Sequence, residues 1–270
     1  MRSVNPLAHR VPRQPDDSRL TGADRVLAVL RSLGDYPRGV GLEELARDVG
    51  VPKSSLHRAL AALRRAGFAE HDERGSYRLG LELVRIAFAY YEQLDRRQVI
   101  EPVLEALAVR FGETAHYAEL DGAEVVYLAK MTPPGRGAQM TSIVGGRNSA
   151  HCTALGKALL AYDLVDENAV AAYVDGHGPL ARRTDHTRCT AKDLAMDLAF
   201  VRARGYALDD EENEKGINCI AYPLFLDRRS HATGAVSISA LVHRMGIVQI
   251  QEAAAEMRTL IEVALGAVTR

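Results

Sequence analysis

The stretch LARDVGVPKSSLHRALAALRRAGFAE, residues 45–70, decides the fold of the N-terminal part of the chain. A helical pattern ends at Gly50, a residue suited to the left-handed turn that follows many helices. Pro52 fits the start of a second helix, which is predicted over 53–65. The backbone N–H that proline lacks would have no hydrogen-bond partner in the first turn of a helix. Two short helices joined by a tight glycine turn predict a helix-turn-helix.

The second helix has one apolar stripe and one polar face without any acidic residue. In a helix-turn-helix the N-terminal residues of this helix contact base edges in the major groove. The bland alternative is a packing domain whose basic face is solvated. The order of helix, turn and acid-free helix favours DNA binding, and the predicted contact residues are Lys53, Ser54, Ser55, His57 and Arg58.

The flanking residues extend the motif. A helix with apolar spacing is predicted over 22–33, and two short strand patterns, 68–71 and 76–79, surround an Asp- and Gly-containing turn. Arg74 lies at the tip of this hairpin, where it can reach the flanking DNA backbone or the minor groove. The pattern therefore predicts a winged helix-turn-helix.

Charge is distributed unevenly along the 270 residues. Residues 1–80 contain 14 Lys/Arg against 10 Asp/Glu, whereas residues 81–270 contain 20 against 25. A basic first part suggests a polyanionic partner.

The length suits two domains, and no apolar run is long enough to span a bilayer. The N-terminus has no apolar segment of a secretory signal, and the three cysteines lack metal-type spacing. These features predict a cytoplasmic protein.

The second part of the chain mixes strand and helix patterns, which predicts an α+β domain. Strands are expected at 114–120, 124–130, 139–144, 206–209, 217–225 and 233–240, and helices at 98–110, 153–162, 166–174, 191–204 and 246–267.

A candidate ligand site follows from these strands. Because strand neighbours alternate faces, Asp209 and Asp210 must point in opposite directions. Thr153 can cap a helix whose first N–H groups attract a small anion. The predicted pocket combines an anion seat with a carboxyl group, a thiol and two hydroxyls, and its residues are Ala154, Leu155, Asp209, Cys219, Ser237 and Ser239.

The motifs together resemble the IclR family of bacterial transcriptional regulators. The resemblance rests on the quoted stretch and on YRLGLELV, LDGAEVVYLAK, GGRNSAHCTALGKALLA, RARGYALDDEENEKGINCIAYPLF and GAVSISA, in this order. It implies a homodimer or dimer of dimers that binds operator DNA and a small effector.

The Pro, Arg and Asp content of residues 1–20 predicts a disordered tail, which the resemblance does not include. The predicted winged helix-turn-helix follows over 21–80, and the resemblance implies a linker helix over 81–97 and a GAF/PAS-like effector domain over 98–270. In such families the positions of the six pocket residues face the effector. Further lining is implied from Met140, Val144 and Asn148, although Asn148 is polar where the family is often apolar.

Two alternatives remain open at this point. His151 and Cys152 are neighbours in sequence, so an enzyme with a cysteine nucleophile is conceivable, but no protease signature surrounds either pocket cysteine. A metal-dependent sensor could use His151, Cys152, Asp209 and Cys219, although their spacing matches no known metal motif. We therefore predict no catalysis, metal or cofactor, and a DNA-binding regulator that responds to a small, carboxylate-bearing molecule.

Overall fold

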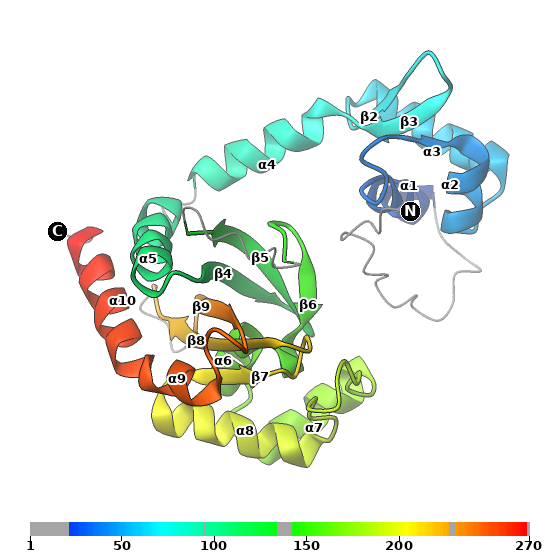
Figure 1. Ribbon diagram of the computed structural model, residues 1–270. Helices are drawn as coiled ribbons and strands as arrows, with labels where there is room; N and C mark the ends of the chain where they lie inside the picture. The colour runs from blue at the N-terminus through cyan, green and yellow to red at the C-terminus, as the bar shows by residue number, and fades with distance from the viewer. Residues whose placement is uncertain (1–21, 94–95, 134–141, 227–230, 269–270) are drawn as a thin grey trace. The chain divides into compact units, whose positions relative to one another are not determined.

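The structure of the chain is a computed structural model that describes residues 22–93, 96–133, 142–226 and 231–268 (Figure 1). The tail expected over 1–20 and the predicted site residue Met140 lie outside the described residues. The chain divides into two compact units, Met1–Asp95 and Arg96–Arg270. Each unit is described by itself below.

The N-terminal unit is a winged helix-turn-helix. Gly50 ends the second helix in the left-handed conformation, with φ of 73°, and its N–H donates to the carbonyl of Ala46. A small sheet in the order β1-β3-β2 packs beside the helices. The elements are α1 (Gly22–Leu33), β1 (Val40–Gly41), α2 (Leu42–Val49), α3 (Lys53–Arg65), β2 (Ala69–His71), β3 (Ser76–Leu79) and α4 (Leu81–Gln93).

The apolar stripe of α3 holds this unit together. Leu56 is 0% exposed and packs in one cluster with Val29 of α1 and Leu45 of α2. Burying a leucine side chain stabilises a fold by about 1.5–3 kcal/mol, so the stripe fixes the orientation of α3. Strand β1 has only two residues, too few to give a strand pattern in the sequence. It pairs Val40 with Tyr77 of β3.

The C-terminal unit is built on a six-stranded antiparallel sheet in the order β6-β5-β4-β9-β8-β7. Its strands are β4 (Thr114–Asp121), β5 (Glu124–Met131), β6 (Arg147–Ser149), β7 (Ala207–Asp210), β8 (Ile217–Leu224) and β9 (Gly234–Leu241). Its helices are α5 (Arg96–Phe111), the 3-10 turn η2 (Ala150–Cys152), α6 (Ala154–Asp163), α7 (Glu167–His177), α8 (Ala191–Arg204), α9 (Ile247–Glu252) and α10 (Ala254–Val268).

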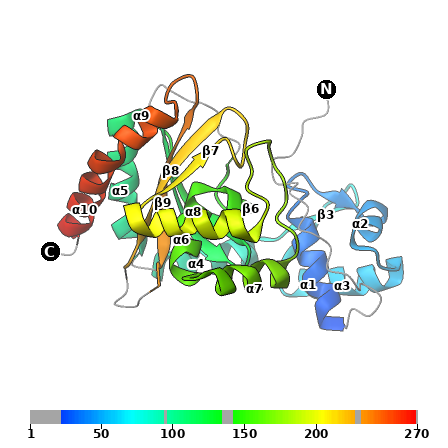
Figure 2. The ribbon, with the colours of Figure 1, turned by 90° about the horizontal axis from the view of Figure 1, so that it is seen from below.

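Helices cover both faces of this sheet (Figures 1 and 2). Helices α5 and α10 lie side by side on one face, where Ile220 and Ile238 point. Helices α6, α7 and α8 cover the other face, where Ala221 and Ala235 point. The strands therefore alternate between two cores, as expected for a sheet buried on both sides.

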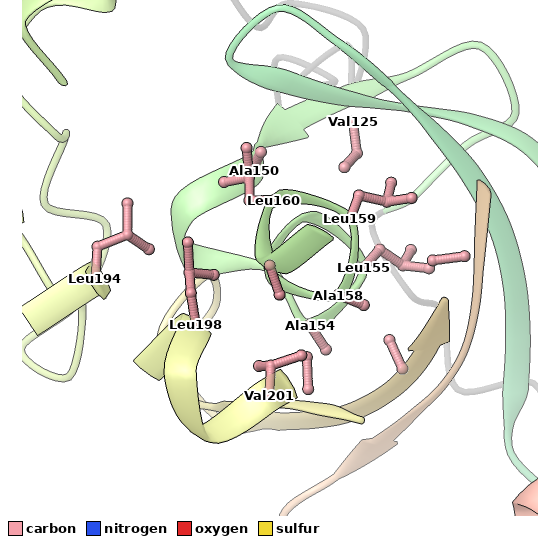
Figure 3. Packing of buried hydrophobic residues seen from close by; sticks show 14 of the residues in the cluster. Val125, Ala150, Ala154, Leu155, Ala158, Leu159, Leu160, Leu194, Leu198 and Val201 are labelled. Carbon is pink, nitrogen blue, oxygen red and sulfur yellow. The ribbon is translucent and has the colours of Figure 1, made fainter. Parts of the chain in front are cut away.

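Helix α6 lies between the sheet and α8, and its small and apolar residues allow this close packing. Ala158 and Leu159 are nearly fully buried, and Leu198 of α8 packs in the same cluster (Figure 3). This core fixes where α6 begins, which matters for the site described below.

Two predicted elements differ from the structure. Of the strand expected over 139–144, the described residues 142–144 are not in a strand; the strand is β6, at 147–149, which pairs with β5. The glycine pair Gly145–Gly146 forms a turn before it, with φ of 83° at Gly145. The single helix expected over 246–267 is two helices, with Ala253 between them.

Candidate functional site

Helix α3 presents a polar surface on the side opposite the core. Lys53, Ser54, His57 and Arg58 are exposed, and Ser55 is half-buried. The ammonium of Lys53 forms an ion pair with Glu43 of α2. Both side chains are largely exposed, so the pair is weak.

Arg74 lies at the tip of the β2–β3 hairpin and is exposed. The turn is held by Asp72, whose carboxylate accepts hydrogen bonds from the N–H groups of Arg74 at 3.0 Å and Ser76 at 2.8 Å. Gly75 completes the turn with φ of 81°. The hairpin thus presents Arg74 on a defined turn.

In the C-terminal unit, the face of the sheet toward α6 carries a polar cavity. Asp209 lies opposite Cys219, and Cys219 opposite Ser239, so one row of side chains crosses three strands. His116 lies opposite Ser237 on the neighbouring pair. The structure brings together around this cavity Ala154, Leu155, Asp209, Cys219, Ser237 and Ser239.

The start of α6 forms one wall of the cavity. Thr153 caps the helix, with its hydroxyl accepting from the N–H of Gly156 at 3.1 Å. The first N–H groups of a helix have no partner within the helix, and Ala154 and Leu155, which carry two of these groups, line the cavity. Together with the helix dipole, such groups favour a negatively charged ligand atom.

Asp209 forms the opposite wall. The residue is 3% exposed, and its Oδ1 accepts from the N–H groups of Glu212 at 2.8 Å and Asn213 at 3.3 Å. Burial raises the pKa of the carboxyl group to about 7, against the lowering effect of nearby Lys157. Near neutral pH this carboxyl group can therefore hold or release a proton.

A chain of hydrogen bonds runs along the floor. The Cys219 thiol donates to the Ser239 hydroxyl at 3.1 Å. Ser239 lies 3.4 Å from Nδ1 of His116, whose Nε2 lies 2.7 Å from the Ser142 hydroxyl. Burial lowers the pKa of His116 to about 3 and raises that of Cys219 well above its ordinary value. The imidazole is therefore neutral and a weak base, and the thiol stays protonated.

One hydroxyl in the cavity has no partner. Ser237 is 1% exposed, and its Oγ makes no hydrogen bond within the described part of the chain. An unpaired buried hydroxyl costs about 1–3 kcal/mol. A bound ligand with a polar atom near Ser237 would remove this cost.

The cavity is small. It holds about 40 Å³ that the centre of a water molecule can reach. A small organic molecule matches this size.

Other predicted residues lie elsewhere. Val144 is 58% exposed and is not part of the cavity wall. Asp210 is exposed, in agreement with the strand alternation. Asn148 does line the cavity, and its amide donates to the Tyr127 hydroxyl at 3.1 Å.

Sequence reasoning missed several residues that line the cavity. His116 lies in β4, where five consecutive residues are buried, so no alternation of polar and apolar residues marks it. The missed residues are His116, Tyr127, Ser142, Asn213, Glu214 and Ile217.

The metal alternative gains no support from the described residues. The group with metal-ligand geometry that they contain is His186, Asp210 and Glu211, which do not line the cavity. Instead, the Nε2–H group of His151 donates to the carbonyl of Ala181 at 3.1 Å. Cys152 is buried, and burial raises the pKa of its thiol to about 12.

A winged helix-turn-helix combined with a cavity-bearing α+β domain defines a class of protein, the DNA-binding transcriptional regulators with an effector domain. Residues 22–73 match the IclR helix-turn-helix domain, and residues 88–262 match the bacterial transcriptional regulator IclR C-terminal domain. The chain belongs to the IclR family, and the effector domain has the half-barrel of GAF/PAS-like folds.

Curated relatives agree. The chain is 35% identical over 223 residues to the glycerol operon regulatory protein of Streptomyces coelicolor, covering 82% of this chain and 85% of the relative. It is 33% identical over 228 residues to the HTH-type transcriptional regulator XynR of Escherichia coli, covering 84% and 88%. Regulators in this set include repressors, such as the transcriptional repressor IclR of E. coli.

The fold is shared with solved structures. An IclR homologue from Microbacterium hydrocarbonoxydans, solved with 4-hydroxybenzoate, superposes with a TM-score of 0.75 at 24% identity, covering 92% of this chain and 100% of that one. Among the described residues of this chain, no helix has the length and apolarity needed to cross a membrane.

Proposed function

We propose that the chain is a cytoplasmic regulator that binds operator DNA through α3 and the wing, and whose C-terminal cavity binds a compact carboxylic acid. The observation that carries the ligand class is the start of α6, whose first residues, Ala154 and Leu155, line the same cavity as the unpaired Ser237 hydroxyl. We propose that the N–H groups of Ala154 and Leu155 receive a carboxylate and that the Ser237 hydroxyl receives a hydroxyl or oxo oxygen.

The charge of the cavity narrows the ligand further. Asp209 and Glu214 both line it, and no lysine or arginine does among the described residues. A second ligand carboxylate would meet only like charge and the neutral His116. A monocarboxylate whose other polar group is uncharged fits, provided that Asp209 holds a proton when the anion binds.

The size of the cavity favours a small ligand. A space of about 40 Å³ open to water centres suits a short hydroxy- or oxo-acid. The ligand named for the Microbacterium protein, 4-hydroxybenzoate, is a larger monocarboxylate. We therefore expect lactate, glycolate or pyruvate to bind more tightly than 4-hydroxybenzoate.

The chemistry of the site suits binding rather than nucleophilic catalysis. A cysteine nucleophile acts as the thiolate, whereas burial raises the pKa of Cys219 and Cys152. His116 is too weak a base to activate a neighbouring hydroxyl at neutral pH.

Matched ligands test the carboxylate seat. Lactate and lactamide have the same shape, but only lactate carries an anion for the α6 amides. We expect lactate to raise the melting temperature of the full chain at pH 6.5, because a ligand that binds only the folded state stabilises it. Lactamide should give no shift, and calorimetry would provide both affinities. Equal binding of lactate and lactamide would refute a carboxylate site at the start of α6, and so would tighter binding of an amine.

A second prediction concerns DNA. Arg58→Ala should weaken binding to an operator selected from random duplexes by about 1–3 kcal/mol for each base-edge contact that is lost. Folding should be intact, because Arg58 is exposed and off the apolar stripe. Arg182→Ala, an exposed arginine of the other unit, is the matched control. Unchanged affinity for Arg58→Ala at fixed salt would remove this face of α3 from the interface.

Regulation would follow from two states of a homodimer or dimer of dimers. Two DNA-binding units on one duplex gain avidity, and the effector changes operator affinity only if it binds one arrangement of the units more tightly. The boundary of the effector domain is proposed at residue 98, close to where α5 begins.

A further inference from the structure

A lysine lies in the centre of the C-terminal core. Lys157 is 1% exposed, and its ammonium donates to Asp197 Oδ2 of α8 at 2.6 Å and to Glu212 Oε1 at 2.5 Å. A buried ammonium is costly and persists only where carboxylates surround it. Burial disfavours its charged form, but the two carboxylates outweigh this effect and raise the pKa of Lys157.

The location of Lys157 connects the two walls of the cavity. The residue lies on α6 within one turn of the Ala154 and Leu155 N–H groups. Its partner Glu212 lies on the β7–β8 connection, residues 211–216, and the N–H of Glu212 donates to Asp209 at 2.8 Å. One ammonium therefore ties the wall that holds the anion seat to the wall that holds Asp209.

Lys157 also provides a positive charge that acts on Asp209. Glu212, whose Oε2 has no partner among the described residues, provides a negative charge that acts on the same carboxyl group. Tyr127, Cys152 and Cys219 face Asp209 as well, but burial raises the pKa of each, so they are uncharged near neutral pH. His116 on the same cavity is neutral. The Lys157–Glu212 pair thus supplies the charges that act on Asp209 from outside the cavity.

We propose that Lys157 is a positioning residue of the effector site: without touching the ligand, its ammonium holds the start of α6 against the β7–β8 connection and fixes the charge behind Asp209. The proposal deepens the proposed function, since the site that Lys157 positions is the carboxylate site. It also predicts how Asp209 titrates in the absence of ligand.

The two members of the pair act on Asp209 with opposite sign. The positive charge of Lys157 lowers the pKa of Asp209, and the negative charge of Glu212 raises it. Lys157→Met should therefore move the midpoint of the Asp209 titration to higher pH, and Glu212→Gln should move it to lower pH. A general loosening of the core would move both variants in the same direction.

The ligand-free experiment is a ¹³C NMR titration of aspartate carboxyls in the full chain, with the Asp209 signal assigned by its loss in Asp209→Asn. Lys215→Met is the control, since Lys215 is exposed on the same connection, and its midpoint should equal that of the wild type. If Lys157→Met fails to fold, Lys157→Gln takes its place beside Glu212→Gln, because it removes the same positive charge. Unchanged midpoints, or shifts of both variants in one direction, would overturn the proposal.

A ligand experiment then tests the positioning. At pH 5.5 Asp209 is protonated in the wild type and in Lys157→Met, so charge on Asp209 no longer distinguishes them. We expect lactate affinity in calorimetry to be at least tenfold lower in Lys157→Met than in Lys215→Met. Equal affinities would overturn the positioning role. If the wild type itself fails to bind lactate, the proposed ligand class is wrong, and the NMR titration still decides whether Lys157 controls Asp209.

Discussion

Replacing Gly156 with alanine should lower the stability of the C-terminal unit by about 3 kcal/mol and abolish effector binding. A Cβ at this position would lie 2.2 Å from the carbonyl oxygen of Ala150 and 2.3 Å from its Cα. Both are backbone atoms of η2, so no flexible side chain can yield. The helix start must shift instead, and the Ala154 and Leu155 N–H groups move with it.

Thermal unfolding measures this effect. A loss of that size lowers the melting temperature by roughly 6–12 °C in a unit of this length. Gly176→Ala is the matched control, because Gly176 is also helical, in α7, and a Cβ there meets nothing within 4 Å. That variant should be neutral or more stable by about 0.5–1 kcal/mol. Similar melting temperatures for the two variants would show that α6 can start elsewhere.

Lactate binding should weaken about tenfold for each pH unit above the pKa of Asp209, which is about 7. The anion binds the form in which Asp209 is protonated, because two buried like charges repel. Below pH 7 the affinity should be constant, and between pH 7 and 9 it should fall by about a hundredfold. Calorimetry at fixed ionic strength would give the profile, and its slope should vanish in Asp209→Asn. A flat profile in the wild type would place the carboxylate away from Asp209.

Stability without ligand gives an independent check on the same group. Asp209 has an ordinary pKa of 3.8 in the unfolded chain and about 7 in the folded one, so the folded state binds its proton more tightly. The resulting stabilisation is fully present below pH 3.8 and is lost as the pH rises through 7. Asp209→Asn should therefore gain stability relative to the wild type between pH 5 and pH 8.

Much of the fold could be predicted because local signals agree with the tertiary structure. The left-handed turn at Gly50 and the cap of α8 by Thr190, whose hydroxyl accepts from the N–H of Asp193, depend on neighbours in sequence. The opposite orientations of Asp209 and Asp210 depend only on strand alternation. These features need no knowledge of distant residues.

The rest depends on contacts that sequence spacing does not reveal. Lys157 lies in a segment that reads as an ordinary helix, and lysine is almost never fully buried unless it is paired; its partners Asp197 and Glu212 are 40 and 55 residues away. The pairing of β4 with β9 likewise places His116 opposite Ser237. Burial then makes the histidine neutral, a property that no local pattern contains.

The row of polar side chains across β7, β8 and β9 has a consequence for how this protein can change over evolutionary time. The hydrogen bonds that join these strands belong to the backbone, so an exchange among small residues at Cys219, Ser237 or Ser239 alters what the cavity recognises while leaving the ladder intact. The ligand preference of the cavity can therefore change while the sheet stays the same. A lineage could acquire a response to a new small molecule through one or two such exchanges, and a laboratory library restricted to these three positions should yield variants with altered effectors from a scaffold that still folds.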